Sequence, residues 1–359
     1  MKKIISIFLL IALLLTGCST QENRKDSAAS GMNSEQESQE DLTAEANGGS
    51  VSEQEDQKNW TTEVIGSISH GVSMTGGETV SLEYDGGEMD IEYWANAAGI
   101  AQSCGFLIFI NGIPQPYKVD GRSDDYSYLH EFEFREGEEE AFTFQFVPVT
   151  GKQGDVLSVC ITSIINPGFI PDMQETRSYG VSHSAIAALY SLTFNADAKQ
   201  TDYGLEARNT YLSNVTTTGS ELTDQYLDEY FGGNVPPDTE MMVYPQLYLD
   251  GNSTDLLSFY DLTGKDTVHI SFTIFGLPGA EYKNVFYLNH EPLEYEESDA
   301  FQVTLIGRNL VTIEMDLDVS DMEGGNTLYV ISVPCNSDAF PYDLLMGKTN
   351  SIDLYSQGN

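Results

Sequence analysis

The sequence predicts an all-β protein whose body consists of two tandem β-sandwich domains. Two observations support this prediction: apolar and polar side chains alternate along many short segments, and one order of such segments occurs twice in the chain. The first 58 residues differ in composition and are predicted to form a leader and a linker outside both domains.

Residues 1–17 are predicted to be a secretory signal peptide. Lysines at positions 2 and 3 are followed by the apolar run "IISIFLLIALLL" at residues 4–15. This run is shorter than the roughly 20 apolar residues that span a bilayer as a helix, so it favours a cleaved signal over a membrane span.

The signal ends in "LTGC" at residues 15–18, which resembles the lipobox of bacterial lipoproteins. The resemblance covers only the start of the chain, and it implies cleavage before Cys18 and attachment of lipid, palmitate included, to that residue. Several acyl chains on one residue are enough for stable anchoring. We therefore expect a mature protein that begins at Cys18 and is lipid-anchored at the extracytoplasmic face of the cell membrane, on the cell surface.

Residues 18–58 are predicted to be a disordered acidic tether that starts at the lipidated cysteine. The segment contains no aromatic residue and is dominated by Ser, Glu, Gln, Asp, Asn and Gly. Such a composition cannot bury enough apolar surface to offset the entropy of ordering the chain. A flexible coil of this length reaches roughly 35 Å, so the tether separates the body from the membrane.

Alternating segments in the body predict half-buried β-strands. In "AFTFQF" every second residue from Phe142 to Phe146 is aromatic, and in "VTIEMDLDV" every second residue from Val311 to Val319 is apolar. The segments "TVHISFTIF" and "IAALYSLTF" alternate in the same way. Such runs, separated by Gly, Asn, Asp and Pro, are typical of sandwiches.

The same order of segments occurs in both halves of the body. "CGFLIFINGIPQPY" at residues 104–117 and "NVFYLNHEPLEY" at residues 284–295 each predict a strand, a turn at an asparagine and a second strand. The two turn residues are Asn111 and Asn289. The match predicts two collinear copies, over residues 59–197 and 198–359, in which Leu157 corresponds to Leu328.

The body is strongly acidic, which limits its partners. The chain has a net charge of −40, and its first 58 residues hold five basic and ten acidic side chains, so the body keeps −35. A surface of this sign repels nucleic acid and anionic lipid heads. The expected partners are the membrane, through the lipid anchor, and a neutral glycan, a basic peptide or another surface protein, but no nucleic acid.

Calcium is the one cofactor that the acidic composition suggests. Two clusters of carboxylates lie near predicted turns: Asp120, Asp124 and Asp125, and Asp316, Asp318, Asp321 and Glu323. Oxygen ligands suit calcium, although neither cluster has the spacing of an EF-hand loop. Solvated acidic loops are the alternative interpretation.

Three cysteines remain beside Cys18, at positions 104, 160 and 335. An odd number in an exported protein allows one disulfide and one free thiol. Cys104 and Cys160 lie in the same copy and are the candidates for pairing, with buried free thiols as the alternative.

No compact catalytic signature occurs in the sequence. There is no Gly-x-Ser-x-Gly nucleophile elbow and no Cys-x-x-Cys pair, and the segments that begin with "HE" lack the second His of a zinc-protease helix. We therefore expect no catalytic residues. A hydrolase that uses paired surface carboxylates is an alternative, because the many Asp and Glu residues offer pairs that the sequence cannot tell apart.

Residues 226–248 ("YLDEYFGGNVPPDTEMMVYPQLY") are the richest segment that the two copies do not share. A short helix is predicted near 221–231, with Ser220 as its N-cap. Rigid aromatic surface dominates molecular recognition, so the candidate ligand-binding residues are Tyr226, Tyr230 and Phe231. The alternative is a strap packed between the two domains.

These features predict a membrane-anchored, non-catalytic module for binding, adhesion or display. In alternation and turn spacing the body resembles the Ig-like sandwiches of bacterial surface proteins, without a motif specific to one family. Such folds host many functions, so the resemblance implies a fold and no particular role. A structural subunit of a cell-surface protein complex and a secreted hydrolase are the alternatives.

Overall fold

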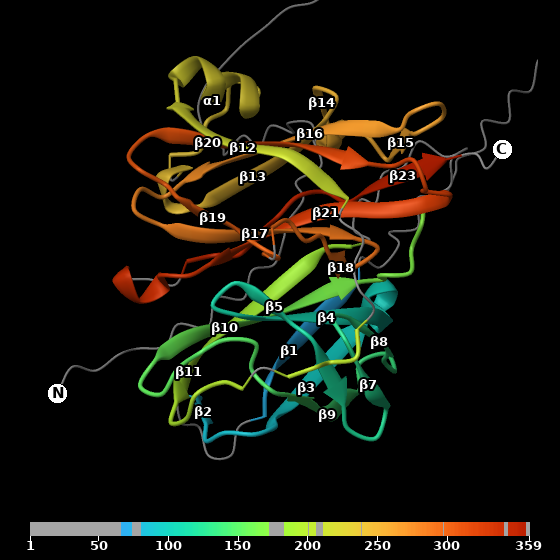
Figure 1. Cartoon of the computed structure of the whole chain (residues 1–359), viewed down its shortest axis with the longest axis vertical. Helices are drawn as coiled ribbons and strands as arrows, with labels where there is room; N and C mark the ends of the chain where they lie inside the picture. Colours follow the sequence, from blue (N-terminus) through green and yellow to red (C-terminus); the bar gives the residue numbers. More distant parts are fainter. Residues whose placement is uncertain are drawn as a thin grey trace, which may run out of the picture. The chain divides into compact units, whose positions relative to one another are not determined.

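The computed structural model describes residues 66–73, 80–171, 183–199, 201–205, 211–237, 239–296, 298–340 and 344–356 (Figure 1). The predicted signal peptide, Cys18 and the predicted tether lie outside these residues. Residues 60–359 form one compact unit. No helix in the described part of the chain is long and apolar enough to cross a membrane.

The first sandwich consists of two sheets, here called sheets I and II. Sheet I has the order β1-β3-β9-β6-β7, with β1 Ser67–Val72, β3 Met89–Ala98, β9 Glu139–Phe146, β6 Tyr117–Val119 and β7 Ser123–Ser127. Sheet II has the order β2-β11-β10-β4-β5, with β2 Ser81–Tyr84, β11 Ala185–Phe194, β10 Val156–Ile165, β4 Ser103–Ile110 and β5 Ile113–Gln115. Strand β8 (His130–Glu133) also pairs with β4, and the 3₁₀ helix η1 spans Gly99–Gln102.

The second sandwich also consists of two sheets, III and IV. Sheet III has the order β12-β20-β16-β13-β14, with β12 Leu212–Glu221, β20 Asn309–Asp318, β16 Thr267–Gly276, β13 Val243–Leu249 and β14 Asn252–Ser253. Sheet IV has the order β15-β23-β21-β17-β18, with β15 Phe259–Asp261, β23 Ile352–Ser356, β21 Gly324–Pro334, β17 Glu281–Leu288 and β18 Glu291–Pro292. Strands β19 (Phe301–Thr304) and β22 (Gly347–Lys348) add to β17 and β21. The helices are α1 Asp224–Tyr230, η2 Thr239–Met241, η3 Thr254–Leu256 and η4 Ser337–Ala339.

The two sandwiches share one topology, so the predicted all-β fold of two tandem Ig-like sandwiches is confirmed. The equivalent strands of sheets I and III are β1 and β13, β3 and β16, and β9 and β20. The equivalent strands of sheets II and IV are β2 and β15, β11 and β23, β10 and β21, β4 and β17, β5 and β18, and β8 and β19. In the first sandwich β2 pairs in parallel with the last strand, β11, and in the second β15 pairs in parallel with the last strand, β23. In both, the strand that precedes this parallel strand in the chain belongs to the opposite sheet. Two packed sheets with this strand order define the Ig-like arrangement.

The two sandwiches differ at one edge of sheets I and III. In sheet I, the strand beyond β9 is β6, which follows β5 in the chain and is itself covered by β7. In sheet III, the corresponding place beside β20 is taken by β12, which precedes all the other strands of the second sandwich. No described strand covers β12, so the second sandwich lacks a counterpart of β7.

The repeated asparagine turns are equivalent in detail. Asn111 and Asn289 both adopt left-handed backbone conformations, with φ of 50° and 52°, which asparagine tolerates better than most residues. The Asn111 N–H donates to Ser158 O (2.7 Å), and the Asn289 N–H donates to Thr327 O (2.8 Å).

These hydrogen bonds correct one predicted correspondence between the copies. Val159 pairs with Ile110 immediately before the first turn, and Leu328 pairs with Leu288 immediately before the second turn. Leu328 therefore corresponds to Val159 and not to Leu157. The error of two residues keeps the same side-chain face, because β-strands alternate with period two.

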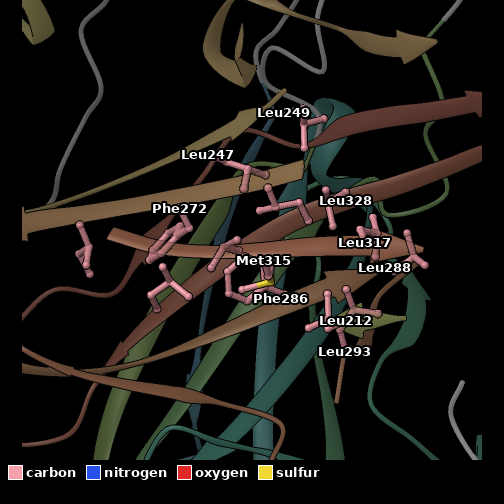
Figure 2. Packing of buried hydrophobic residues seen from close by; sticks show 14 of the residues in the cluster. Leu212, Leu247, Leu249, Phe272, Phe286, Leu288, Leu293, Met315, Leu317 and Leu328 are labelled. Atoms are coloured by element: carbon pink, nitrogen blue, oxygen red, sulfur yellow. The ribbon is translucent and has the colours of Figure 1, made fainter. Parts of the chain in front are cut away.

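The cores of the two sandwiches differ in composition. The first is rich in aromatic rings, among which Tyr93, Phe106 and Phe144 are fully buried with centroids 5.0–5.7 Å apart. The second is mainly aliphatic, as Figure 2 shows for leucines of β12, β13, β17, β20 and β21 around Met315 and two phenylalanines. Burial of each such side chain stabilises the fold by roughly 1.5–3 kcal/mol.

A third apolar cluster joins the two sandwiches through the outer faces of sheets II and IV. Its buried members are Leu107, Phe109, Cys160, Ile164, Val285, Tyr287, Tyr329, Ile331 and Val333. The rings of Phe109 and Tyr287 meet edge to face at 6.3 Å, and Lys283 Nζ donates to Asn111 O at 2.7 Å. The central strands of both sheets are consequently buried on both faces.

His70 on β1 connects the two sheets of the first sandwich. Its Nε2 lies 3.0 Å from Ile186 O, and its Nδ1 lies 2.6 Å from the hydroxyl of Tyr93. A carbonyl can only accept, so Nε2 carries the proton and Nδ1 accepts from Tyr93 in a neutral ring. Burial lowers the pKa of His70 from 6.5 to about 4.

We predict that the cluster between the sandwiches contributes to the stability of the whole body. Ile331 is fully buried there, so Ile331→Ala should cost about 2–5 kcal/mol of unfolding free energy in a urea titration. Ile306→Ala is the matched control, because Ile306 is 69% exposed and should change the value by less than about 0.5 kcal/mol. Equal effects of the two substitutions would contradict this role.

We also predict that His70 makes the body less stable in acid. In the unfolded chain this ring becomes protonated below its ordinary pKa of 6.5, whereas in the folded chain it stays neutral until about pH 4. Stability should therefore fall as pH falls through this window, and His70 should account for about 3 kcal/mol of the loss by pH 4. Unfolding titrations of His70→Gln should show a correspondingly shallower decline. Identical declines in the two proteins would exclude this contribution.

Candidate binding site at helix α1

Helix α1 begins and ends with standard capping groups. The Thr223 side chain accepts a hydrogen bond from Tyr226 N (3.1 Å), and the Phe231 N–H at the other end donates to Leu227 O (2.9 Å). The helix therefore spans Asp224–Tyr230, and its N-cap is Thr223 rather than the predicted Ser220. Ser220 cannot cap a helix, because it belongs to β12 and pairs with Leu310.

The three predicted ligand-binding aromatics attach this helix to sheet III. Tyr226, Tyr230 and Phe231 are half-buried, and all three contact Phe275, with centroids 5.8, 5.0 and 6.4 Å away. Tyr230 and Phe231 also contact Tyr244, whose ring stacks on Phe275 at 5.0 Å.

These three residues are therefore only partly exposed, and their role in ligand binding stays a prediction. Their rings pack between the helix and the outer face of β13 and β16, which satisfies their need for apolar contact within the chain. Nor is the segment a strap between the two sandwiches, because Leu222, Leu227, Phe275 and Leu310 of its apolar cluster all belong to the second sandwich.

Burial keeps the phenols around this cluster neutral. It is the main cause that raises the pKa of Tyr230 and of Tyr248 well above the usual range of tyrosine, with nearby Asp255 adding to both shifts. The Tyr248 hydroxyl donates to Gln246 Oε1, and the Gln246 amide donates to Asp255 Oδ2 at 3.0 Å. The helix is thus supported by apolar rings with a hydrogen-bonded polar border.

A cavity of about 550 Å³ opens beside α1. It is lined mainly by apolar side chains of Leu222, Leu227, Val235, Pro236, Pro237, Met241, Phe275 and Pro278. Its principal charged groups are Asp224 and Arg308, which form an exposed ion pair at 2.7 Å. A cavity of this size and lining suits an apolar side chain or a small apolar ligand.

Exposed aliphatic side chains extend the apolar surface around the cavity. Val235 and Met241 in its wall are 38% and 53% exposed. Met242 and Ile306, next in sequence to cavity residues, are 39% and 69% exposed. Scattered exposed apolar residues are normal, but exposed apolar side chains in the wall of an apolar cavity, such as Val235 and Met241, make it a candidate interaction site.

The sequence pointed to part of this site only. Val235, Pro236, Pro237 and Met241 lie within residues 226–248, the segment that the two copies do not share. Phe275 lies at the end of β16, Pro278 in the turn after β16 and Arg308 in the loop before β20, and no local pattern connects them to that segment.

Neither acidic cluster gathers into a calcium site. Asp120, Asp124 and Asp125 lie on and beside the β6–β7 hairpin, while Asp316 bonds to His269 Nδ1 (2.9 Å) and Asp318 bonds to Ser320 Oγ (2.7 Å). Asp321 and Glu323 follow in the turn before β21. In the parts of the chain that the structure describes, no three His, Cys, Asp or Glu side chains are placed to hold a metal ion.

The candidate disulfide does not form, because Cys104 and Cys160 point to opposite faces of sheet II. Cys104 lies in the core of the first sandwich, and Cys160 lies in the cluster between the sandwiches. Both thiols are free and buried, and burial raises their pKa values, that of Cys160 to about 12.

A buried polar group accompanies the apolar cluster between the sandwiches. His290 Nε2 lies 2.8 Å from Pro167 O, and its Nδ1 lies 2.9 Å from the Tyr329 hydroxyl. Lys348 Nζ donates to Ser351 Oγ (2.9 Å) and lies 4.5 Å from the centre of the Tyr329 ring. Burial lowers the pKa of Lys348 to about 7, so this lysine can lose its charge near neutral pH.

Comparisons with known proteins find likeness in structure only. No family model matches the chain, and no curated protein matches it in sequence. The chain is similar to the N-terminal Ig1-2 module of the Drosophila receptor protein tyrosine phosphatase DLAR, at 11% identity over 82% of this chain and 99% of that one, with a TM-score of 0.20.

Two bacterial assemblies are similar to the chain at the same low level. One is the Salmonella enterica SafA pilin with the SafB chaperone, at 11% identity, 80% and 95% coverage and a TM-score of 0.22. The other is the CsuC–CsuE chaperone and tip adhesion subunit complex of Acinetobacter baumannii Csu pili, at 10% identity, 77% and 95% coverage and a TM-score of 0.17. The Ig-like fold of this chain is defined by its own strand order and pairing.

Proposed function

We propose that this protein is a lipid-anchored, extracytoplasmic binding module that holds a partner protein without chemically changing it. The cavity beside α1 is the observation that carries the proposal. It combines an apolar interior with exposed aliphatic side chains at its border, as expected where part of a partner becomes buried.

The anchoring part of the proposal comes from the N-terminal sequence. A positively charged start, an apolar run and the "LTGC" box occur together in the first 18 residues. A lipidated Cys18 followed by a long polar tether would hold the body near the membrane while leaving its surface accessible.

The chemistry of the cavity favours a protein among the expected partners. A neutral glycan is usually held against exposed aromatic rings, whereas the rings of Tyr226, Tyr230 and Phe231 pack within the chain. A cavity of aliphatic and proline side chains instead matches one or two apolar side chains of a protein. The body's charge of −35 further favours a partner whose surrounding surface is neutral or basic.

We predict that Cys18→Ala releases the protein from the membrane or leaves its signal uncleaved. Without the cysteine no acyl chain can be attached, and the tether has no apolar segment of its own to replace it. Cell fractionation and metabolic labelling with radioactive palmitate measure the two effects. Labelling that persists in the variant would contradict the lipid anchor.

We predict that the cavity contacts a protein partner in intact cells. A photo-crosslinking amino acid at Met241, on the exposed border, should give a discrete protein adduct in cells that make this chain. Adding Val235→Asp places a carboxylate in the cavity wall and should reduce the adduct by about tenfold, equal to about 1.4 kcal/mol.

The matched control is Val156→Asp, the same substitution at a valine of the first sandwich that is 64% exposed. This control should leave the adduct unchanged. No adduct from Met241, or an adduct that Val235→Asp and Val156→Asp reduce equally, would contradict binding at the cavity.

A further inference from the structure

Strand β12 is an unusually long free edge. It has ten residues, whereas the edge strands β1, β2, β5, β7, β14, β15 and β18 have between two and six. A free edge presents unpaired N–H and C=O groups, and proteins commonly limit this exposure by keeping edge strands short.

The edge of β12 carries little of the usual protection. Its sequence "LSNVTTTGSE" contains no lysine, arginine or proline. A bulge disturbs the pairing between Ser213 and Thr216, but from Thr216 to Glu221 the register with β20 is regular. All residues of this second half are exposed, so neither side chains nor neighbouring segments cover it.

In the first sandwich the strand equivalent in position to β12 is covered by a further strand. There, β6 occupies the place beside β9, and β7 pairs with the far side of β6. In the second sandwich β12 occupies the place beside β20, and none of the described strands pairs with its far side. The position of one further strand is therefore open.

The hydrogen-bonding pattern identifies which groups of β12 are free. The Leu222 N–H, directly after the strand, donates to Arg308 O (2.8 Å) of the loop before β20. In an antiparallel pair such bonds occur at every second residue, so Thr218 and Ser220 also face β20. The backbone N–H and C=O groups of Thr217, Gly219 and Glu221 then point away from the sheet.

We propose that β12 accepts an extended segment of a partner protein as an additional strand of sheet III, and that this segment is neutral or basic. Glu221 lies at one end of the edge, and Glu314, Asp316 and Asp318 lie on or beside the residues of β20 that pair with β12. This acidic surrounding favours a basic segment and disfavours a second copy of the chain, whose body would bring another charge of −35.

Addition of a strand draws its affinity from backbone hydrogen bonds, and the side chains of alternate residues supply specificity. The small side chains of Thr217, Thr218, Gly219 and Ser220 leave room for a partner's side chains on both faces. This edge is separate from the cavity beside α1, and the inference goes beyond the function proposed above. Val235→Asp changes no backbone group of β12, so the two proposals can fail independently.

The test uses the full-length chain in detergent micelles and a synthetic nonapeptide of alternating Thr and Val with Lys at both ends. With the peptide at millimolar concentration, amide hydrogen exchange should slow by about tenfold or more at Thr217, Gly219 and Glu221. Exchange at Thr218 and Ser220, whose N–H groups already face β20, should not change. The same peptide N-methylated on alternate amides should give no protection, because it cannot donate to the edge.

Two substitutions at one position make a matched pair. Gly219→Pro removes an outward N–H without removing a bond to β20, and it should weaken peptide binding by about tenfold. Gly219→Ala is the control: a methyl group there meets no atom within 4 Å, and binding should be retained. Thermal melts of both variants report whether the sandwich is still folded.

Three results would overturn the proposal. One is the absence of protection at the three outward amides with millimolar peptide. Another is equal protection by the N-methylated peptide, which would mean that backbone pairing is not involved. The third is self-association of the chain without peptide that Gly219→Pro abolishes, which would make a second copy the occupant of the edge.

Discussion

The apolar contact between sheets II and IV is the constraint on which the rest of the structure depends. An ordinary sandwich buries one face of each sheet and leaves the other face to water. Here the outer faces of β4 and β10 carry Leu107, Phe109 and Cys160, and those of β17 and β21 carry Tyr287 and Tyr329. Neither sandwich can expose such a face without a large free-energy cost, so the two halves form one body.

This constraint leaves a visible trace in the sequence. The run "FLIFI" at residues 106–110 is apolar at every position, as is "VFYL" at residues 285–288. Continuous apolar runs are typical of strands buried on both faces, whereas the alternation of "AFTFQF" is typical of strands with one wet face. The repeated segment thus marks the contact between the two sandwiches as well as their shared topology.

Local patterns in the sequence were sufficient for the fold class and for the equivalence of the copies. Alternation gave the strands, and the asparagine turns at Asn111 and Asn289 are equivalent because both need a left-handed residue. The correspondence of Leu157 with Leu328 failed by one full period of the strand, since periodicity fixes the face of a residue but not its position along the strand.

The candidate site was less accessible to sequence analysis, because its parts come together only in three dimensions. The exposure of Tyr226, Tyr230 and Phe231 depends on their contacts with Tyr244 and Phe275. The sequence of α1 and its neighbours does not show whether these contacts form. The cavity likewise needs the turn after β16 and the loop before β20. The carboxylate clusters failed for a related reason: closeness in sequence does not make side chains converge on a metal ion.

The same apolar contact determines which sheet of the second sandwich has surfaces open to a partner. Sheet IV uses its outer face to join the first sandwich, so that face is not available to a partner. Sheet III keeps its outer face, on which α1 packs with its cavity, and it keeps the free edge of β12. Strand β12 precedes the other strands of the second sandwich, and no strand in the described part of the chain pairs with its far side as β7 pairs with β6. The two surfaces that we propose for binding, the apolar cavity and the open strand edge, therefore both belong to the second sandwich on the side of sheet III.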